Sequence, residues 1–535
     1  MATRMNWKRL LSTKRVADYT KCETNPKVSQ LSEPRSAFEK DFDQLTFSYP
    51  FRRLQDKTQV IPFPKFDFVH TRLTHSLEVA SVGRSFGKMA AEIIFRELDE
   101  EFLNASNICR SDIGALVAAA CLAHDIGNPP FGHSGEDAIS YYFLQKDNNF
   151  KPDFEIHDGK FYKRKFLPEN DFKETVLEYI PSDEEIKQVK RWKDLSQFEG
   201  NANGFRIITG NCDKCINPSL ALIGSFTKYP KESFLFQDPF GDLGKKDKPK
   251  SQTKYGFFQE QRELFQFVAD ELGLIKIENI GSTDIAYRRH PLAFLMEASD
   301  DIAYGMIDFE DGCRLGLIDF DKKYQKIKLR KNDNSVEEII LNKSPKEILV
   351  EIANVDESFD SEKLESFTDF KQAISYLRSK VINVLIHQCF SVFEKEYDKI
   401  MVGGFDKSLI DCIAHEGIKK NLSLMSDLVR KFVYQYPPVL ESEASGFEVM
   451  EHLIGSFAIT SNICFSCGDE ETTKDRKLRS LLPDEFQPIS EKEIEQLTMQ
   501  EKYERVLSVL DYISGMTDKY AINLYRKIKG LYIER

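Results

Sequence analysis

The chain has 535 residues, of which 41% are hydrophobic and 12% are aromatic, and phenylalanine alone occurs 41 times. This composition indicates a folded protein and excludes a largely disordered one, while the length allows one large helical body or roughly two to four ordinary domains. The formal net charge of −12 argues against a protein coated in basic surface for nucleic acid, although it leaves room for a local basic channel.

The first residues, MATRMNWKRLLSTKR, are basic, but the apolar segment of a secretory signal does not follow them. The chain contains no run of about 18 apolar residues, so we predict a cytoplasmic protein without membrane spans. Its ten cysteines are irregularly spaced, which is typical of a reducing compartment. Two CxxC pairs, Cys212–Cys215 and Cys464–Cys467, lack the usual modular zinc spacing, and a shared structural zinc is the minor interpretation.

Apolar residues at helical spacing predict helices over most of the chain. The first candidate for metal binding or catalysis, His75, lies near the start of one such helix. Residues 113–123, IGALVAAACLA, are apolar on nearly all faces, which predicts a helix buried in the middle of a bundle. This helix should stop at Gly127, and it carries His124 and Asp125 at its end.

Prolines at positions 129–130 cannot continue that helix, so a rigid turn is expected after the His-Asp pair. Residues 134–144, SGEDAISYYFL, predict another helix, with His133 at its entrance and Glu136 three residues further on. At that spacing the side chains of His133 and Glu136 can face the same space.

Strand signals are few and lie outside the helical segments. Residues 154–166 alternate around an Asp-Gly turn, and residues 324–341 alternate around an Asn-Asp-Asn turn. Both patterns predict peripheral hairpins. Residues 231–255 are rich in Lys, Pro and Gly, which predicts a long loop of the kind that is often functional.

Residues 291–308, PLAFLMEASDDIAYGMID, predict a mostly apolar helix that begins with proline. At about 100° per residue, Glu297, Asp300, Tyr304 and Asp308 fall within an arc of roughly 80°. Carboxylates are costly to bury unless they are paired or bind a metal. The stripe therefore requires a ligand or an ion-pair network.

Together, His75, His124, Asp125 and Asp300 match the ligand set of a metal site. Two imidazole nitrogens and two carboxylate oxygens suit Mn²⁺, Fe²⁺, Ni²⁺, Zn²⁺ or Mg²⁺, and four protein ligands leave positions open for water and substrate, which favours catalysis. Taken singly, His75 is more typical of a hydrogen-bonded or surface histidine, and Asp300 of a salt bridge. The adjacent His124 and Asp125 with His133 nearby are harder to explain by core packing, and they favour a metal-dependent phosphohydrolase.

The pattern H…HD…D resembles that of the HD phosphohydrolase superfamily, and the chain is similar to its deoxyguanosine triphosphate triphosphohydrolase branch. The similarity extends over nearly the entire chain. Its segments are NWKRLLSTKR (6–15), FSYPFRRLQDKTQV (47–60), TRLTHSLEV (71–79), FEGNANGFRI (198–207), TKYP (227–230), RHPLAFLMEASDDIAY (289–304) and DYISGMTDKYA (511–521).

This resemblance implies a mainly α fold, an HD-domain helical bundle with additional C-terminal helices and minor peripheral β-hairpins. We expect an N-terminal helical segment over residues 1–60 and a phosphohydrolase core over residues 61–312, with loop insertions near 150–168 and 231–256. Residues 313–535 are expected to form a C-terminal helical region with substrate-pocket and oligomer contacts.

The resemblance also implies roles for individual residues. Metal binding falls to His75, His124, Asp125 and Asp300, with Mn²⁺ or Mg²⁺ expected and other transition metals open. Proton transfer near the scissile phosphate falls to His133 and Glu136. The expected substrate-binding residues are Arg53, Arg72, Asn203, Arg206, Lys228, Tyr229, Lys254, Tyr304 and Asp308.

Within that set, Arg72 lies one helical turn from His75, which suits a clamp on the α-phosphate. By resemblance, Lys228 and Lys254 hold the β- and γ-phosphates, while Tyr304 and Asp308 line the deoxyribose. An acidic protein that takes a tetra-anionic substrate needs such a concentrated positive pocket.

The implied activity is metal-dependent hydrolysis of a deoxynucleoside triphosphate, preferably dGTP, at the α-phosphate. The products are deoxynucleoside and inorganic tripolyphosphate, and the role is control of dNTP pools. The alternatives are an HD nucleotidase or phosphodiesterase with a different cleavage point, and a non-catalytic protein that binds nucleotide or single-stranded DNA. The resemblance further implies a homo-oligomer, commonly a hexamer, with single-stranded DNA as a candidate regulator. Spacing identifies neither the guanine-reading residues nor the native metal.

Overall fold

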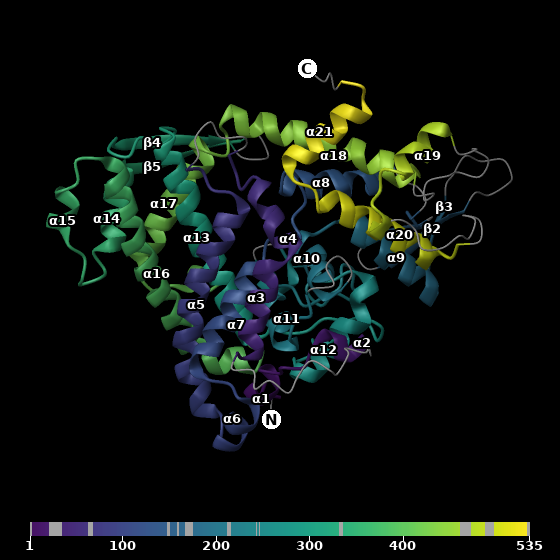
Figure 1. Cartoon of the computed structure of the whole chain (residues 1–535), viewed down its shortest axis with the longest axis horizontal. Coiled ribbons are helices and arrows are strands. Elements are labelled where there is room, and N and C mark those ends of the chain that lie inside the picture. Colours follow the sequence, from purple (N-terminus) through teal and green to yellow (C-terminus); the bar gives the residue numbers. More distant parts are fainter. Residues whose placement is uncertain are drawn as a thin grey trace.

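The structure is a computed structural model of the whole chain. It describes residues 3–20, 35–61, 68–146, 150–152, 154–157, 160–165, 175–210, 216–241, 243–244, 247–330, 335–460, 472–486 and 497–531. Both CxxC pairs and the central residues of both predicted hairpin turns lie outside this described part. The fold is mainly helical, as predicted, with two small antiparallel sheets at its edges (Figure 1).

Three long helices form the centre of the molecule: α5 (Arg72–Glu97), α7 (Arg110–Ala123) and α13 (Pro291–Arg314). Residues 113 and 116–123 of α7 are almost completely buried, because small alanines allow its neighbours to approach closely. A Cβ atom at Gly87 of α5 would lie 2.5 Å from the carbonyl oxygen of Ile113, so glycine is required there for the contact between α5 and α7. The predicted buried helix is confirmed.

Other helices surround this centre on three sides (Figure 1). The first group comprises α1 (Trp7–Leu10), α2 (Val16–Thr20), α3 (Ala37–Phe47), α4 (Tyr49–Arg53), α6 (Glu100–Ser106), α11 (Leu220–Phe226) and α12 (Arg262–Leu272). A second group comprises α14 (Pro345–Ala353), α15 (Ser361–Glu365), α16 (Phe370–Met401) and α17 (Glu416–Phe432). The third comprises α8 (His133–Tyr141), α9 (Asp183–Ser196), α10 (Gly200–Thr209), α18 (Pro437–Thr460), α19 (Thr473–Arg479), α20 (Met499–Ser514) and α21 (Asp518–Ile528).

Short helical turns connect these elements. They are the 3₁₀ turns η1 (Leu54–Asp56), η3 (Lys250–Gln252), η4 (Gln259–Gln261), η5 (Ile410–Cys412) and η6 (Asp484–Phe486), and the π-type turn η2 (Tyr142–Lys146). Most of the buried apolar side chains among the described residues lie in one large cluster around the three central helices and in a second cluster where α18, α20 and α21 cover α8, and two small clusters lie elsewhere. Each cluster supplies the hydrophobic stabilisation of its own part of the fold.

The strands confirm both predicted hairpins and add a strand that was not predicted. Strand β1 (Phe154–His157) pairs antiparallel with β2 (Lys160–Lys165), which also pairs with β3 (Thr175–Tyr179). Strand β4 (Tyr324–Arg330) pairs antiparallel with β5 (Val336–Lys343), with Ile327 opposite Ile339. Only five residues long, β3 carries too little pattern to identify from sequence.

Two helix boundaries differ from the sequence prediction. Helix α7 ends at Ala123 rather than at Gly127, because the following N–H groups turn back: Ile126 donates to Ala123 and Asn128 donates to Asp125. The His-Asp pair therefore lies in a turn beyond the helix. Helix α13 runs on to Arg314, six residues past the predicted end, since its apolar face continues against α16 and α17.

Groups from distant parts of the chain hold this turn in place. The carboxylate of Asp518 accepts hydrogen bonds from the N–H groups of Phe131, at 3.0 Å, and Thr58, at 2.9 Å. The buried ammonium of Lys57 donates to the carbonyl oxygens of Asn128, at 2.6 Å, and Ser514, at 2.8 Å. The start of α21 and the end of α20 thus bind the residues that follow the His-Asp pair.

The turn also packs without any spare space. A Cβ atom at Gly127 would lie 2.1 Å from both the carbonyl oxygen of Gly200 and the amide nitrogen of Gly204. We expect Gly127→Ala to lower the free energy of unfolding by about 1–3 kcal/mol, because the clash is with backbone. The matched control is Gly305→Ala, whose Cβ would meet no atom within 4 Å, and which should be neutral or stabilising by up to about 1 kcal/mol. Equal chemical-denaturation midpoints for the two variants would contradict this prediction.

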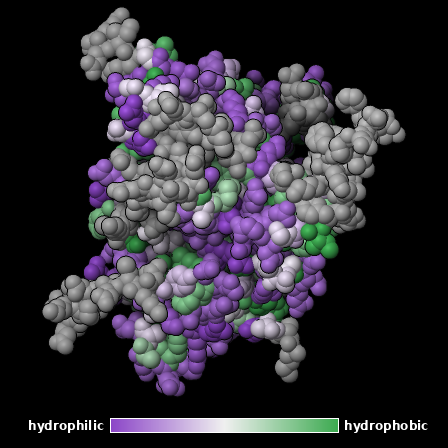
Figure 2. Space-filling model, turned by 90° about the vertical axis from the view of Figure 1, so that its right-hand side faces the viewer, coloured by the Kyte–Doolittle hydropathy of each residue, from purple (hydrophilic) through white to green (hydrophobic). Residues whose placement is uncertain are grey.

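The described surface is predominantly polar. Hydrophilic residues prevail among the described residues of the face drawn in Figure 2, and hydrophobic ones form small separate patches there. Among the described residues, no helix combines the length and apolar character that crossing a membrane would require.

Candidate active site

Side chains from the three central helices converge on one point. His75 lies in the first turn of α5, His124 and Asp125 directly follow α7, and Asp300 lies in α13. The Nε2 atom of His75 lies 3.3 Å from Oδ1 of Asp300, and Nε2 of His124 lies 3.5 Å from the same oxygen and 3.6 Å from Oδ1 of Asp125. Ligand atoms about 2.1 Å from one ion are roughly 3.0–3.5 Å apart, so these spacings are close to those of a coordination shell.

The two imidazoles are oriented for metal binding. Nδ1 of His124 lies 2.7 Å from the carbonyl oxygen of Cys121, and a proton on that nitrogen leaves Nε2 as a lone pair. Nε2 of His124 is buried and has no hydrogen-bond partner among the described residues, and Nε2 of His75 is the nitrogen that faces Asp300. Burial acts to raise the pKa of Asp300, but His124, His75 and Lys228 outweigh it and hold that pKa well below its ordinary value. His75, His124, Asp125 and Asp300 together fit a divalent cation, and these four residues form the predicted metal-binding group.

Three of the predicted phosphate-binding cations lie around this group, and each is paired with a carboxylate. Nη1 of Arg72 donates to Oδ2 of Asp125 at 2.9 Å. The Nζ atom of Lys228 lies 3.5 Å from Oε1 of Glu297 and 3.8 Å from Oδ2 of Asp300. The remaining pair, Lys254 with Glu199, has a distance of 3.0 Å between Nζ and Oε1.

The predicted proton-transfer pair forms a direct hydrogen bond at the start of α8. Nδ1 of His133 lies 2.8 Å from Oε2 of Glu136, and Oε1 of Glu136 accepts the N–H of Gly200 at 2.8 Å. The His133 side chain is 85% exposed whereas that of Glu136 is 9% exposed, so a buried carboxylate holds an accessible imidazole. The hydrogen bond that His133 donates to Glu136 raises the pKa of His133 above its ordinary value. Burial opposes ionisation of Glu136, but His133 and Lys254 keep its pKa below the usual range.

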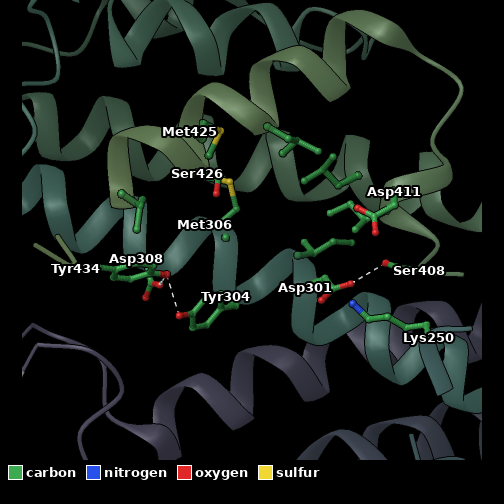
Figure 3. Close-up of a pocket in the computed structure, with 16 residues that line it drawn as sticks. Lys250, Asp301, Tyr304, Met306, Asp308, Ser408, Asp411, Met425, Ser426 and Tyr434 are labelled. Atoms are coloured by element: carbon green, nitrogen blue, oxygen red, sulfur yellow. Dashed lines mark hydrogen bonds between the residues drawn. The ribbon is translucent and has the colours of Figure 1, made fainter. Parts of the chain in front are cut away.

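A cavity of about 290 Å³ opens beside the metal-binding group, between α13 and α17 (Figure 3). The ring of Tyr304 is 6.4 Å from that of His75, centroid to centroid, which places one wall of the cavity against the metal-binding group. The Tyr434 hydroxyl lies 2.5 Å from Oδ2 of Asp308 and 2.8 Å from the Tyr304 hydroxyl. Burial raises the pKa of Asp308 to about 7, although its hydrogen bonds act in the opposite direction.

Apolar side chains form the middle of this cavity, and polar groups lie at both ends. The apolar lining comes from Ile302, Met306, Leu385, Leu422, Met425 and Val429. At the end opposite Tyr434, Asp301 accepts a hydrogen bond from Ser408 at 2.9 Å, beside Lys250 and Asp411 (Figure 3). Asp301 thus faces the cavity, whereas Asp300 contacts both imidazoles. Such a mixture of apolar walls and a few convergent polar groups is typical of small-molecule sites.

Four predicted substrate-binding residues make other contacts in the structure. Arg53 donates to the carbonyl oxygen of Gly515 at 2.8 Å and stacks on Tyr49. The buried Arg206 binds Asp511 at 2.8–2.9 Å and also Glu260. The amide of Asn203 donates to the carbonyl oxygen of Gly127 and to Ser514, and Tyr229 lies buried against Lys228. These contacts tie the centre to the C-terminal helices, and direct substrate contact by the four residues stays a prediction.

Sequence reasoning missed two residues of this site. Tyr434 carries no motif and reaches Asp308 from 126 residues further along the chain, so no spacing could identify it. Glu199 belongs to the segment FEGNANGFRI, which was recognised as family-like, but only Asn203 and Arg206 were selected from it. A buried glutamate beside a glycine-rich helix start was the available signal.

Comparison with known proteins agrees with this geometry. The chain matches the HD domain over residues 72–192 and the phosphohydrolase-associated domain over residues 413–527. It is 34% identical to a deoxyguanosinetriphosphate triphosphohydrolase-like protein of Synechocystis sp., over 98% of this chain and 100% of the relative. A Listeria monocytogenes protein of the same description is 33% identical, over 98% and 100%. The chain belongs to the deoxyguanosinetriphosphate triphosphohydrolase family. A Salmonella typhimurium protein named deoxyguanosinetriphosphate triphosphohydrolase is 27% identical over 92% of this chain and 94% of the relative.

Membership of the triphosphohydrolase family makes the chain a metal-dependent phosphohydrolase of the HD superfamily. The HD match contains Arg72, His75, the His-Asp pair and the predicted proton-transfer pair, His133 and Glu136. Asp300 lies between the two matched regions, and Tyr434 lies within the phosphohydrolase-associated domain. The cavity is lined by residues of the phosphohydrolase-associated domain and of the segment between the two matches, and it adjoins the HD match where Tyr304 faces His75.

Proposed function

We propose that the protein hydrolyses deoxynucleoside triphosphates, with dGTP preferred, at the α-phosphate to give deoxynucleoside and tripolyphosphate. The observation that carries this proposal is the arrangement around the metal-binding group. A cavity that suits a nucleoside adjoins it through Tyr304, Arg72 and Lys228 lie against it, and Lys254 lies near the His133–Glu136 pair. A metal between a nucleoside pocket and a cationic surface meets the α-phosphate rather than the γ-phosphate.

His75, His124, Asp125 and Asp300 would hold the divalent ion, Mn²⁺ or Mg²⁺. When bound, such an ion supplies polarisation of a phosphate oxygen and lowers the pKa of a water ligand. Arg72 lies one helical turn before His75 on α5, and its guanidinium would offset charge on the transferring phosphoryl group. The two lysines bind the remaining phosphates as point charges.

His133 moves the proton of the reaction, and Glu136 holds it in position. Because Nδ1 of His133 is bound to Glu136, Nε2 is the nitrogen available to the reactants. A neutral Nε2 accepts a proton from the attacking water, and a protonated Nε2 donates one to the leaving 5′-oxygen. Both roles need the same hydrogen bond to Glu136.

The sugar is read by the Tyr304, Asp308 and Tyr434 group. The hydroxyls and the carboxylate of this group offer hydrogen bonds to a 3′-hydroxyl, and the Tyr304 ring packs against the sugar face. A ribose 2′-hydroxyl would meet this wall, so GTP should be a poor substrate compared with dGTP.

Product analysis tests the proposal directly. The full chain is incubated with each of the four dNTPs and with GTP, in Mn²⁺ or Mg²⁺, and the products are separated by ion exchange. Deoxyguanosine and intact tripolyphosphate from dGTP support the proposed cleavage point. Release of orthophosphate or pyrophosphate contradicts it and supports an HD nucleotidase or phosphodiesterase instead.

Gly305 offers a way to fill the cavity without disturbing the fold. A Cβ atom at Gly305 would meet no atom within 4 Å, and the residue lines the cavity. We expect Gly305→Leu to raise the KM for dGTP by about tenfold or more through loss of the space for the nucleoside. Metal content, measured by atomic emission, should stay at the level of the unmodified chain. An unchanged KM in a correctly folded variant would place the nucleoside elsewhere.

A further inference from the structure

The three cations around the site differ in what holds them. Arg72 is held by Asp125, and Lys228 lies between Asp300 and Glu297, whose carboxylate also binds Arg289 at 2.6 Å. An ion bound by Asp125 and Asp300 would neutralise both carboxylates, which would free Arg72 for phosphate and leave Lys228 beside Glu297, a carboxylate that Arg289 already neutralises. Lys254 is different, because its partner Glu199 is not part of the metal-binding group. Metal binding alone therefore leaves Lys254 paired.

Glu199 is buried in a position where an unpaired negative charge is costly. Its side chain is 9% exposed, whereas that of Lys254 is 38% exposed and can swing outward on a flexible stem. Oε1 of Glu199 also accepts the amide of Asn201 at 2.7 Å. If Lys254 leaves, this neutral amide is the only hydrogen-bond donor to the Glu199 carboxylate that the described residues still provide.

A second carboxylate adds to this cost. Glu136 of α8 accepts the N–H of Gly200, the residue next to Glu199, so the two acidic groups share the entrance of α10. Around them lie His133 on Glu136, Lys254 on Glu199 and the buried ring of Tyr255. Burial raises the pKa of Glu199 and the charge of Glu136 raises it further, while Lys254 acts against both. Two neighbouring carboxylates without the lysine between them cannot both stay ionised at low cost.

We propose that Glu199 is a positioning residue, which holds Lys254 beside the site until a triphosphate arrives and takes up a proton as Lys254 turns to the phosphates. The proton comes from the buffer and binds a carboxylate oxygen of Glu199. The charge of this proton replaces that of the Lys254 ammonium beside Glu136. Departure of tripolyphosphate returns Lys254 to Glu199 and releases the proton. The proposal rests on the proposed function for the identity of the ligand.

Calorimetry of inorganic tripolyphosphate binding tests this exchange without turnover. The full-length chain, loaded with Mn²⁺, is titrated near pH 7.5 in two buffers of different ionisation enthalpy, which gives the number of protons taken up. The variant Glu199→Gln keeps the shape and the Asn201 contact but cannot exchange a proton. We expect Glu199→Gln to take up measurably fewer protons than the unmodified chain and to bind tripolyphosphate several-fold more tightly, because Lys254 is no longer held.

Two further variants make the result specific. Lys254→Gln should weaken tripolyphosphate binding by about tenfold and should also lose the proton uptake that depends on Glu199. Glu263→Gln removes an exposed carboxylate of α12 and should match the unmodified chain in both measurements. Proton uptake by His133 is common to the unmodified chain, Glu199→Gln and Glu263→Gln and cancels among them. Loss of Lys254 also raises the pKa of His133, so the Glu199 contribution in that background is read by comparing Lys254→Gln with and without Glu199→Gln.

The proposal is overturned if Glu199→Gln takes up as many protons as the unmodified chain, or if it binds tripolyphosphate more weakly while remaining folded. Tripolyphosphate binding that does not respond to Lys254→Gln overturns it as well. These outcomes differ from a failure of the proposed function, which shows in the products of dGTP hydrolysis. A chain that releases pyrophosphate from dGTP could still exchange Lys254 between Glu199 and a bound polyphosphate.

Discussion

Replacing Asp125 by asparagine is expected to remove bound metal and to lower the turnover of dGTP by about a thousandfold or more. The loss of a carboxylate ligand forfeits several kcal/mol of transition-state stabilisation, and each 1.36 kcal/mol corresponds to about a tenfold change in rate. Asparagine is preferred to alanine because Oδ2 of Asp125 also accepts the buried Arg72 guanidinium, and an amide oxygen can continue to do so. Metal content and product release are measured on the same preparation.

The matched control is Asp301→Asn, one residue from the ligand Asp300. Asp301 accepts a hydrogen bond from Ser408 and faces the cavity. The metal content of the Asp301→Asn variant should therefore equal that of the unmodified chain. If Asp125→Asn retained full metal content and full tripolyphosphate release, the assignment of this group as the catalytic metal site would be wrong. Equal thermal midpoints for both variants would show that folding does not account for the difference.

Glu136→Gln is expected to lower kcat by about 10²–10⁴-fold and to move the pH dependence of the reaction. Glu136 raises the pKa of His133 through their hydrogen bond, so the neutral glutamine returns that pKa toward its ordinary value. The limb of the pH–rate profile that follows His133 should therefore shift to lower pH. The direction of the shift is the same whether His133 acts as base or as acid, because it follows the imidazole pKa.

His133→Gln provides the companion measurement. It should lower kcat by a similar factor, retain metal, and abolish the limb that Glu136→Gln displaces. A shift of the limb to higher pH in Glu136→Gln would contradict the contact seen here. The free energy of unfolding offers a second check. Because the pKa of His133 is raised in the fold, the His133–Glu136 pair stabilises the fold at low pH, and this contribution is lost as the pH rises through that pKa.

Part of the predicted metal-binding group has local sequence signals, whereas His75 and the choice of Asp300 over Asp301 came from the family resemblance. His124 and Asp125 are adjacent, and Asp300 belongs to a proline-started helix whose burial makes a carboxylate conspicuous. The helices of the centre and both hairpins could be predicted for the same reason, since periodicity and turn residues are read within about ten to twenty positions.

The hydrogen-bond and ion-pair partners within the site could not be predicted from sequence, because they depend on packing between distant segments. Lys254 reaches Glu199 across 55 positions, and Tyr434 reaches Asp308 across 126. Arg206 illustrates the opposite case: it belongs to a family-like segment, yet two carboxylates bind its guanidinium within the fold. Sequence identifies a residue as charged and well placed, but the choice between a substrate and a carboxylate partner is made by tertiary structure.

The bonds between the His-Asp turn and the C-terminal helices have a consequence for synthesis of the protein. Phe131 is held by Asp518 across 387 positions, and Lys57 is held by the carbonyl oxygen of Ser514 across 457. A nascent chain on the ribosome can form α5 and α7 early, but it lacks the groups that fix the turn until almost all of it has been translated. We therefore expect premature termination or loss of the last helices to leave the turn that carries His124 and Asp125 without the groups that fix it.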